Sequence, residues 1–263
     1  MIPLRDDQPT RTFPLVTLSL IALNVLVYLA QGPLGLDSNW AMVPYEVTHN
    51  LDLNNVVAHL APSGQVTFTP VPPNTLIHLG PRDIFYGLSP HPLWLTVLTG
   101  MFMHTGFLHI AGNMLFLWIF GNNIEDALGK FRFLLFYLAC GVAAAALQIY
   151  ANPDSVIPNV GASGAIAGVL GAYLLLYPHA RVLTLIPIFG FGFFAHIRAQ
   201  WVLLAWVAYD VLPAFTSANT LRGGGGVAYF AHLGGFAAGL ILILLLGGQS
   251  LAAGQRRAGG YRA

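Results

Sequence analysis

The chain has 263 residues, of which 8% are charged and 56% are hydrophobic, and its mean hydropathy is +0.67. Soluble domains average about 25% charged residues, so this composition excludes an ordinary soluble protein and indicates several membrane spans. The formal net charge of +1 gives no case for nucleic-acid binding. The single cysteine, Cys140, excludes an intramolecular disulfide framework and a thiolate-rich metal site.

Six segments are long and apolar enough to cross a bilayer. In chain order they are 13–30, 102–122, 132–151, 160–177, 199–215 and 227–247. The first follows two arginines but precedes no signal-peptide cleavage site, so we expect it to remain as an anchor. The sequence therefore predicts an all-α membrane protein with a six-helix bundle over 13–247. We expect residues 1–12 to be a cytoplasmic N-terminal tail and residues 248–263 to be a disordered cytoplasmic tail.

Two other segments are less easily placed. The long connection 31–101 is rich in Pro, Asn and His with scattered aromatic residues, so we expect it to lie partly in the membrane. Residues 182–195 are apolar but are interrupted by Pro187, Gly190 and Gly192, which indicates an interfacial segment rather than a seventh span.

Basic residues orient the predicted spans, because Lys and Arg are enriched in cytoplasmic loops. With six spans and a cytoplasmic N-terminus, nine of the eleven basic residues lie inside, and Arg82 and Arg222 lie outside. A seventh span would change that split to six and five, so the charges favour six. In this topology Ser163, His109 and His232 share one depth near the outer face.

Ser163 and His232 each occupy a position in a span where an apolar residue is expected, which makes each a candidate for function. A serine is a weak nucleophile until a base within hydrogen-bond reach takes its proton, and apolar surroundings keep an imidazole neutral and able to do so. Small residues near both would let the two helices approach closely. They are Gly164, Gly168, Gly235 and Gly239. Taken singly, each polar residue could equally be a structural one that bonds a neighbour.

The second predicted span adds His104, His109 and Asn113. His109 and Asn113 are four residues apart and share a helix face. Together with the Ser163 backbone N–H, they could hold the oxyanion of an acyl transfer. His104, five residues before His109, points elsewhere. Metal binding is the rival reading, but the H-E-x-x-H pattern and a nearby carboxylate are both missing, so we expect neither a metal nor a cofactor.

The sequence singles out no acidic residue to orient His232. Asp210 lies near the outer end of the fifth predicted span and could pair with a neighbour. Glu125 and Asp126 lie at the inner end of the second span, where we expect a structural cluster with basic residues. A Ser-His dyad is therefore predicted in preference to a triad. The run G-A-S-G-A around Ser163 is not the G-x-S-x-G elbow of α/β-hydrolases, and no alternating strands are visible, which excludes that fold.

Taken together, the motifs resemble those of rhomboid intramembrane serine proteases. In chain order they are H-x4-H-x3-N from His104 to Asn113, G-x-S-G from Gly161 to Gly164, and A-H-x-x-G-x-x-x-G from Ala231 to Gly239. The resemblance covers roughly 13–247. It implies that Ser163 is the nucleophile and His232 the general base. It also implies that His109, Asn113 and the Ser163 N–H form an oxyanion hole.

The resemblance further implies a half-immersed first loop and substrates that are single-span membrane proteins cut near the outer surface of the bilayer. Two departures stand out: Ala167 replaces an aromatic residue that often packs on the histidine, and Trp94-Leu95 replaces a frequent Trp-Arg. The first leaves open a catalytically silent relative that binds or escorts membrane proteins. A transporter is disfavoured, because the polar groups cluster in one layer. The lack of a transit peptide and of extra domains indicates a bacterial plasma membrane.

Overall fold

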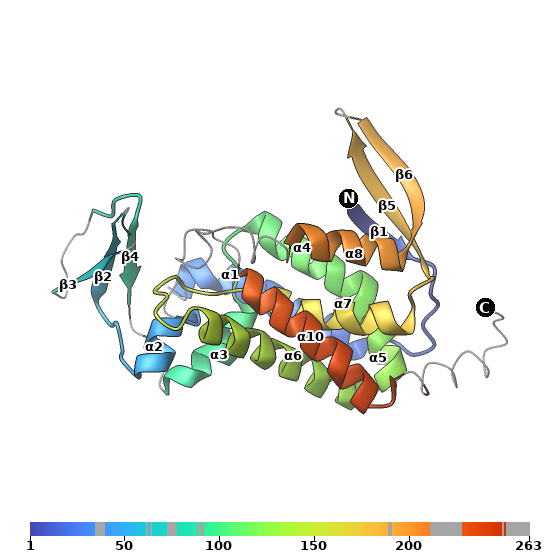
Figure 1. The fold of residues 1–263 in the computed structure, drawn as a ribbon, viewed down its shortest axis with the longest axis horizontal. Coiled ribbons are helices and arrows are strands. Elements are labelled where there is room, and N and C mark those ends of the chain that lie inside the picture. Colours follow the sequence, from blue (N-terminus) through green and yellow to red (C-terminus); the bar gives the residue numbers. More distant parts are fainter. Residues whose placement is uncertain are drawn as a thin grey trace.

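A computed structural model describes residues 1–34, 40–61, 63, 65–72, 78–87, 89, 92–188, 191–210, 228–248 and 250. Helices form the body of the molecule, and two small sheets lie near opposite ends of it (Figure 1). The predicted ends of the fifth and sixth spans at 211–215 and 227, and the predicted tail beyond residue 250, lie outside the described residues.

The main helices follow the predicted spans. They are α1 (Leu15–Leu34), α4 (Phe107–Phe116), α5 (Asn122–Leu128), α6 (Lys130–Ala151), α7 (Ser163–Leu176), α8 (Ala199–Asp210) and α10 (Tyr229–Leu245). A π-helical turn, η4 (Leu117–Gly121), joins α4 to α5. Among the residues that the structure describes, three helical segments are long and apolar enough to cross a membrane: Leu15–Gly32, Phe107–Leu128 and Lys130–Ala151. The helices α7 and α10 are apolar but shorter, so the count of six spans remains a prediction.

Helix α7 occupies the centre of the bundle. Eleven of its 14 residues are buried, as expected for a helix that is apolar on every side. Helix α10 packs against it through glycines, because a Cβ at Gly235 would lie 1.9 Å from Gly164 O and a Cβ at Gly239 would lie 2.0 Å from Gly168 O. The close approach predicted from the spacing of small residues is therefore present.

The prediction of an all-α protein was wrong for three segments: the N-terminal residues, the first loop and the apolar stretch before α8. Strands β1 (Ile2–Asp6), β5 (Arg181–Ile188) and β6 (Phe191–Arg198) form an antiparallel sheet in the order β1-β5-β6. The segment expected at the interface is thus a hairpin, and the expected N-terminal tail supplies its third strand. The reason lies in the residues: β-branched and aromatic side chains favour strands, and short apolar runs do not distinguish strand from helix by periodicity.

The first loop contains the second sheet. Strands β2 (Val56–Leu60), β3 (Val66–Pro70) and β4 (Asp83–Tyr86) pair in the order β3-β2-β4. Short helical segments flank it: α2 (Pro44–His49), η2 (Leu93–Leu95), α3 (Thr96–Thr99) and η3 (Gly100–Phe102). The predicted seating of this loop in the membrane remains a prediction.

The first loop also holds the segment that leads into α7. Met42 and Asn159 exchange backbone hydrogen bonds of 3.1 and 2.8 Å, and the Tyr86 hydroxyl donates to Val156 O. Gly161 N donates to Gly100 O at 2.9 Å. These bonds fix the backbone immediately before Ser163.

At the other end of the bundle, Glu125 and Asp126 bind the start of α1. The Glu125 carboxylate accepts from Thr17 N and Thr17 Oγ1, both at 2.7 Å, and Asp126 accepts from Thr12 N at 2.9 Å. The two carboxylates therefore have a structural role, but as a cap on the first turn of α1, where backbone N–H groups lack intrahelical acceptors, whereas the sequence predicted a cluster with basic residues.

Candidate active site

The serine and the histidine predicted as a catalytic pair meet in the structure. Ser163 is the first residue of α7, and His232 lies in the first turn of α10. The distance between Ser163 Oγ and His232 Nε2 is 2.7 Å, a hydrogen bond between residues 69 positions apart. The close packing of α7 on α10 through glycines brings the two helix ends to this separation.

Gly161 shapes the backbone next to the hydroxyl. Its φ is +123°, a conformation that side chains rarely adopt. A Cβ at this position would lie 2.9 Å from His109 Nε2 and 3.6 Å from Ser163 Oγ. Only glycine fits, because the space beside the hydroxyl is already taken by the His109 ring.

His109 and Asn113 project from α4 toward the same space. Thr105 Oγ1 lies 3.1 Å from His109 Nδ1, so Nε2 is the nitrogen turned to Gly161. Asn113 Nδ2 is buried and has no hydrogen-bond partner among the described residues. A buried donor without an acceptor is costly, and it is suited to an acceptor that arrives with a substrate.

His104 lies next to His109. Its ring packs edge-on against His109 with centroids 5.0 Å apart. Gln31 of α1 holds its backbone, because the amide accepts from His104 N at 2.9 Å and donates to His104 O at 3.0 Å. The expectation that His104 points away from the serine agrees with this position, which supports the His109 ring.

A cleft of about 640 Å³ opens over the serine. Its walls come from α4, from the 152–160 segment and from α8, and both Ser163 and His232 line it. No group of three or more His, Cys, Asp and Glu side chains able to hold a metal ion occurs in the part of the chain that the structure describes. The polar side chains that line the cleft include a hydroxyl, two imidazoles, a carboxylate and several amides.

Comparison with known proteins identifies the family of the chain. The family model described as Rhomboid domain matches residues 91–249, which include every residue of the site. The chain belongs to the rhomboid family. The rhomboid protein "Rhomboid protein 1, mitochondrial" of Saccharomyces cerevisiae is 33% identical over 152 residues, covering 56% of this chain and 40% of the relative.

Two rhomboid relatives from Bacillus subtilis are also similar. "Rhomboid protease GluP" is 39% identical over 100 residues, which cover 38% of this chain and 19% of the relative. "Putative rhomboid protease YdcA" is 30% identical over 152 residues, 58% of this chain and 67% of the relative. The chain thus spans less than half the length of the yeast protein and of GluP. Membership of this family supports a membrane protein. The comparison does not support the predicted bacterial plasma membrane, because a mitochondrial protein is among these relatives.

One expectation about this rhomboid site was wrong: an acidic residue does lie beside the histidine. Asp210, the last residue of α8, places Oδ2 against His232 Nδ1. Neither atom has another hydrogen-bond partner among the described residues, so each faces the other. Both side chains are largely buried, with 10% of His232 and 18% of Asp210 exposed.

The same helix replaces the missing aromatic residue. Ala167 is fully buried and offers the imidazole no ring. Instead, the Trp206 ring lies 6.0 Å from the His232 ring between centroids. Trp206 and Asp210 are four residues apart and share a face of α8. The sequence contained a signal for Trp206 and Asp210: their four-residue spacing, together with the position of the carboxylate at the depth of His232.

Proposed function

We propose that this rhomboid protein is an intramembrane serine endopeptidase that cleaves single-span membrane proteins. The observation that carries the proposal is the 2.7 Å contact between Ser163 Oγ and His232 Nε2. A serine with an imidazole at this distance has the base that its activation requires. The cleft above the pair supplies space for a polypeptide segment.

In the proposed reaction, Ser163 Oγ attacks a substrate carbonyl carbon while His232 Nε2 takes the hydroxyl proton. Asp210 lies on the Nδ1 side of the ring. It therefore favours the tautomer with its proton on Nδ1, leaves Nε2 free to accept, and stabilises the imidazolium that forms. His232 then donates its proton to the leaving amine, and water hydrolyses the acyl-enzyme. The mechanism thus uses a Ser-His pair oriented by a carboxylate, not the unassisted dyad expected from the sequence.

In the proposed reaction, three donors stabilise the oxyanion. The Ser163 backbone N–H lies at the start of α7, where the first N–H groups have no intrahelical acceptor and the helix dipole favours negative charge. Asn113 Nδ2 is without a partner among the described residues, and the Nε2 edge of His109 lies next to Gly161. Such donors act where charge develops in the transition state.

The form of the substrate follows from the setting. A carbonyl inside a helix is hydrogen-bonded within that helix, so a membrane-spanning substrate must unwind before Ser163 can attack. The cleft lies between α4 and α8, so a segment entering from the lipid would pass between these helices. We propose that this segment comes from the part of the substrate near the outer membrane surface.

A catalytically silent relative that escorts membrane proteins is the alternative. Ala167 favours it, since the usual aromatic support of the histidine is missing. The contacts of Trp206 and Asp210 with His232 argue for activity, because they restrain the ring from another helix. A fluorophosphonate probe separates the two, since only an activated serine reacts with it.

The proposal is tested with the purified protein in proteoliposomes and a single-span reporter substrate. Ser163→Ala and His232→Ala should each reduce cleavage at least about 10³-fold while the protein stays folded. Ser19→Ala is the matched control, because the Ser19 hydroxyl donates to Leu15 O at 2.8 Å, within α1 and away from the site. Full cleavage by either site variant would refute the assignment.

A further inference from the structure

The β5–β6 hairpin extends from the bundle where α7 ends and α8 begins. Its two strands have eight residues each, a length of about 26 Å. Figure 1 shows it projecting upward from the bundle, across the direction of α6 and α10. No Lys, Arg, Asp or Glu occurs between Arg181 and Arg198, the residues at its two ends. If the helices cross the membrane, a hairpin that runs at a steep angle to them lies along the membrane surface.

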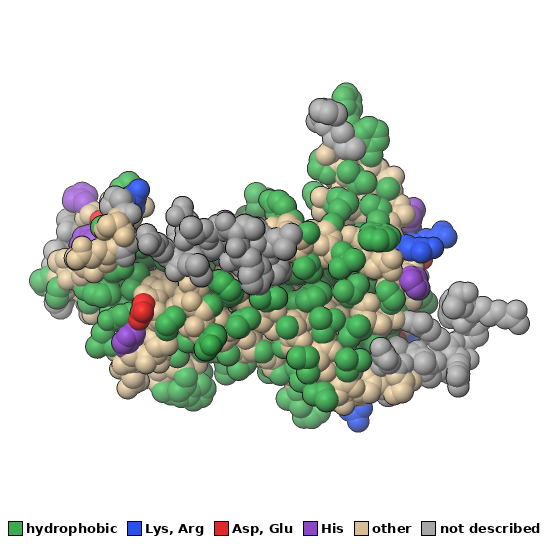
Figure 2. All heavy atoms as spheres, viewed as in Figure 1, with side chains coloured by type: hydrophobic (Ala, Val, Ile, Leu, Met, Phe, Trp, Pro, Cys, Tyr) green, Lys and Arg blue, Asp and Glu red, His purple; other side chains and the backbone are tan. Residues whose placement is uncertain are grey.

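The outer part of the hairpin exposes aromatic side chains. The exposed fractions are 72% for Phe191, 53% for Phe193 and 66% for Phe194. Phe194 pairs with Leu185, and Phe193 pairs with Ile186, so adjacent pairs present apolar side chains on opposite faces of the sheet. Figure 2 shows hydrophobic side chains along this projection. An apolar surface on both faces is unfavourable in water and favourable in lipid.

The base of the hairpin is basic. Arg181 pairs with Arg198, and Leu183 pairs with both His196 and Arg5, so these residues lie on the face that also carries Phe194. Within the described residues, the guanidinium groups of Arg5, Arg181 and Arg198 form no ion pair. Figure 2 shows the Lys and Arg colour at this base, below the hydrophobic projection.

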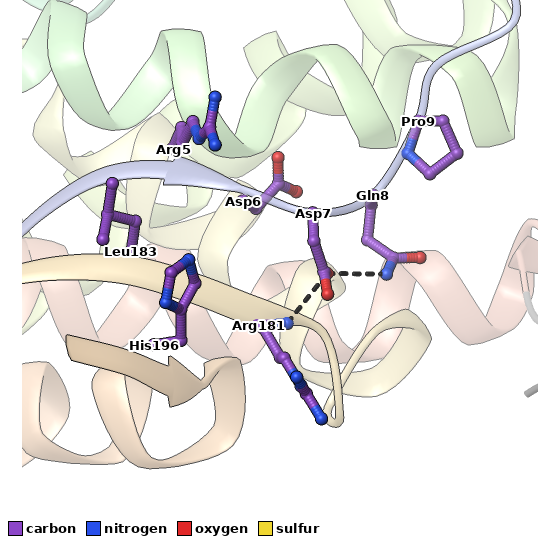
Figure 3. A pocket seen from close by; sticks show the side chains of 8 residues that line it. All are labelled: Arg5, Asp6, Asp7, Gln8, Pro9, Arg181, Leu183 and His196. Carbon is purple, nitrogen blue, oxygen red and sulfur yellow. Dashed lines mark hydrogen bonds between the residues drawn. The ribbon is translucent and has the colours of Figure 1, made fainter.

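A pocket of about 300 Å³ lies at this base. Figure 3 shows Arg5, Arg181 and His196, from three different strands, among its lining residues. Two carboxylates also line it: Asp7 accepts from Arg181 N at 2.8 Å, and Asp6 accepts from the Tyr173 hydroxyl at 2.5 Å. With Arg198, which pairs with Arg181, the base of the hairpin carries three guanidinium groups against these two carboxylates, and this excess of positive charge favours an anionic ligand.

We propose that the hairpin lies in the headgroup layer of the membrane and that its basic end binds the phosphates of anionic lipids. Guanidinium groups form strong hydrogen bonds with phosphate oxygens, and aromatic side chains favour the boundary of the acyl region. The outer edge of β6 carries unpaired backbone groups, which the hydrocarbon core does not tolerate, so the sheet stays at headgroup depth. The inference is independent of the proposed proteolysis.

A second copy of the chain is a poorer occupant. The acidic residues at this end of the molecule already accept hydrogen bonds within the chain. They are Asp6, Asp7, Glu125 and Asp126. The negative charge that complements the arginines is therefore supplied by the lipid.

Depth is measured first, with a spin label on Phe193→Cys in the full chain reconstituted in nanodiscs. The native Cys140 is buried and does not compete for label. Thr67→Cys on β3 is the control, because Thr67 is exposed and we place this sheet in the part of the first loop that lies outside the membrane. We expect the label at 193 to be reached by oxygen and shielded from a nickel chelate, and the label at 67 to be reached by nickel. Nickel access at 193 equal to that at 67 would overturn the proposal.

Lipid choice is measured with a fluorophore at the same cysteine and brominated lipids as quenchers. Brominated phosphatidylglycerol should quench more strongly than brominated phosphatidylcholine. This preference should fall roughly fivefold or more in Arg181→Gln/Arg198→Gln. Arg82→Gln, the same change on the other side of the bundle, should leave it unchanged. Three results would contradict the proposal. The two lipids could quench equally, inorganic phosphate could abolish the preference, or a bound protein could shield the label from both lipids and nickel.

Discussion

Replacement of Gly235 by alanine tests whether the close contact of α7 with α10 sets the catalytic geometry. The new Cβ would lie 1.9 Å from Gly164 O, whereas carbon and oxygen atoms in contact are about 3.4 Å apart. The helices must therefore separate by about 1.5 Å. Gly164 follows Ser163 directly, and Gly235 is one turn from His232, so the displacement falls on the catalytic pair.

The expected loss follows from that displacement. The Ser163 Oγ–His232 Nε2 distance of 2.7 Å would increase to about 4 Å, which is beyond hydrogen-bond range. A misplacement of about 1 Å costs roughly 10²-fold in rate, so kcat/KM should fall by about that factor or more. Overpacking should also lower the free energy of unfolding by about 1–3 kcal/mol.

The assay is cleavage of a single-span reporter in proteoliposomes, with thermal unfolding measured on the same samples. Gly171→Ala should show a smaller loss, because its Cβ would lie 2.5 Å from Phe236 O, farther along the helices from the pair. Gly32→Ala on α1 is the control, since its Cβ would meet nothing within 4 Å. If Gly235→Ala matched Gly32→Ala in both rate and melting temperature, the contact of α7 with α10 would not be what positions the pair.

Three other changes probe separate parts of the molecule. Asp210→Asn should lower kcat by roughly 10²–10⁴-fold and alter the pH–rate profile, with partial recovery in Asp210→Glu; an unchanged profile would remove Asp210 from the site. Asn113→Ala should lower kcat about 10²-fold with little change in substrate binding, as single-turnover kinetics would show. Burial raises the pKa of Asp6 from 3.8 to about 6, so the folded state favours the protonated carboxyl. Thermal stability should therefore rise as pH falls through 6 toward 3.8, and this rise should be absent in Asp6→Asn.

The contact between Ser163 and His232 could be predicted because its signal is local. Ser163 and His232 are polar residues in apolar surroundings, and the glycines beside them have helical spacing, so neither inference needed a known partner. The strands at 181–198 could not be predicted in the same way. A short apolar run broken by proline and glycine suits a strand or an interfacial segment equally, and the pairing of Ile2 with Leu185 joins residues far apart in the chain.

Asp210 shows the same limit at the site itself. The sequence places a carboxylate near the outer end of a predicted span, but it does not state which side chain that carboxylate faces. The contact with His232 depends on the rotation and depth of α8 relative to α10, and so does the position of Trp206 over the imidazole.

The sequence by itself determined the membrane character of the chain, the small-residue contact between two helices, and the serine and histidine that the motifs identify. These follow from the cost of burying polar groups and from the 3.6-residue period, which are properties of each segment alone. Only the tertiary structure decided that a carboxylate and an indole support the histidine from α8, and that the N-terminal residues complete a sheet with the 181–198 hairpin. Both depend on how separate segments pack, because contacts between distant residues are set by the relative placement of whole helices and strands.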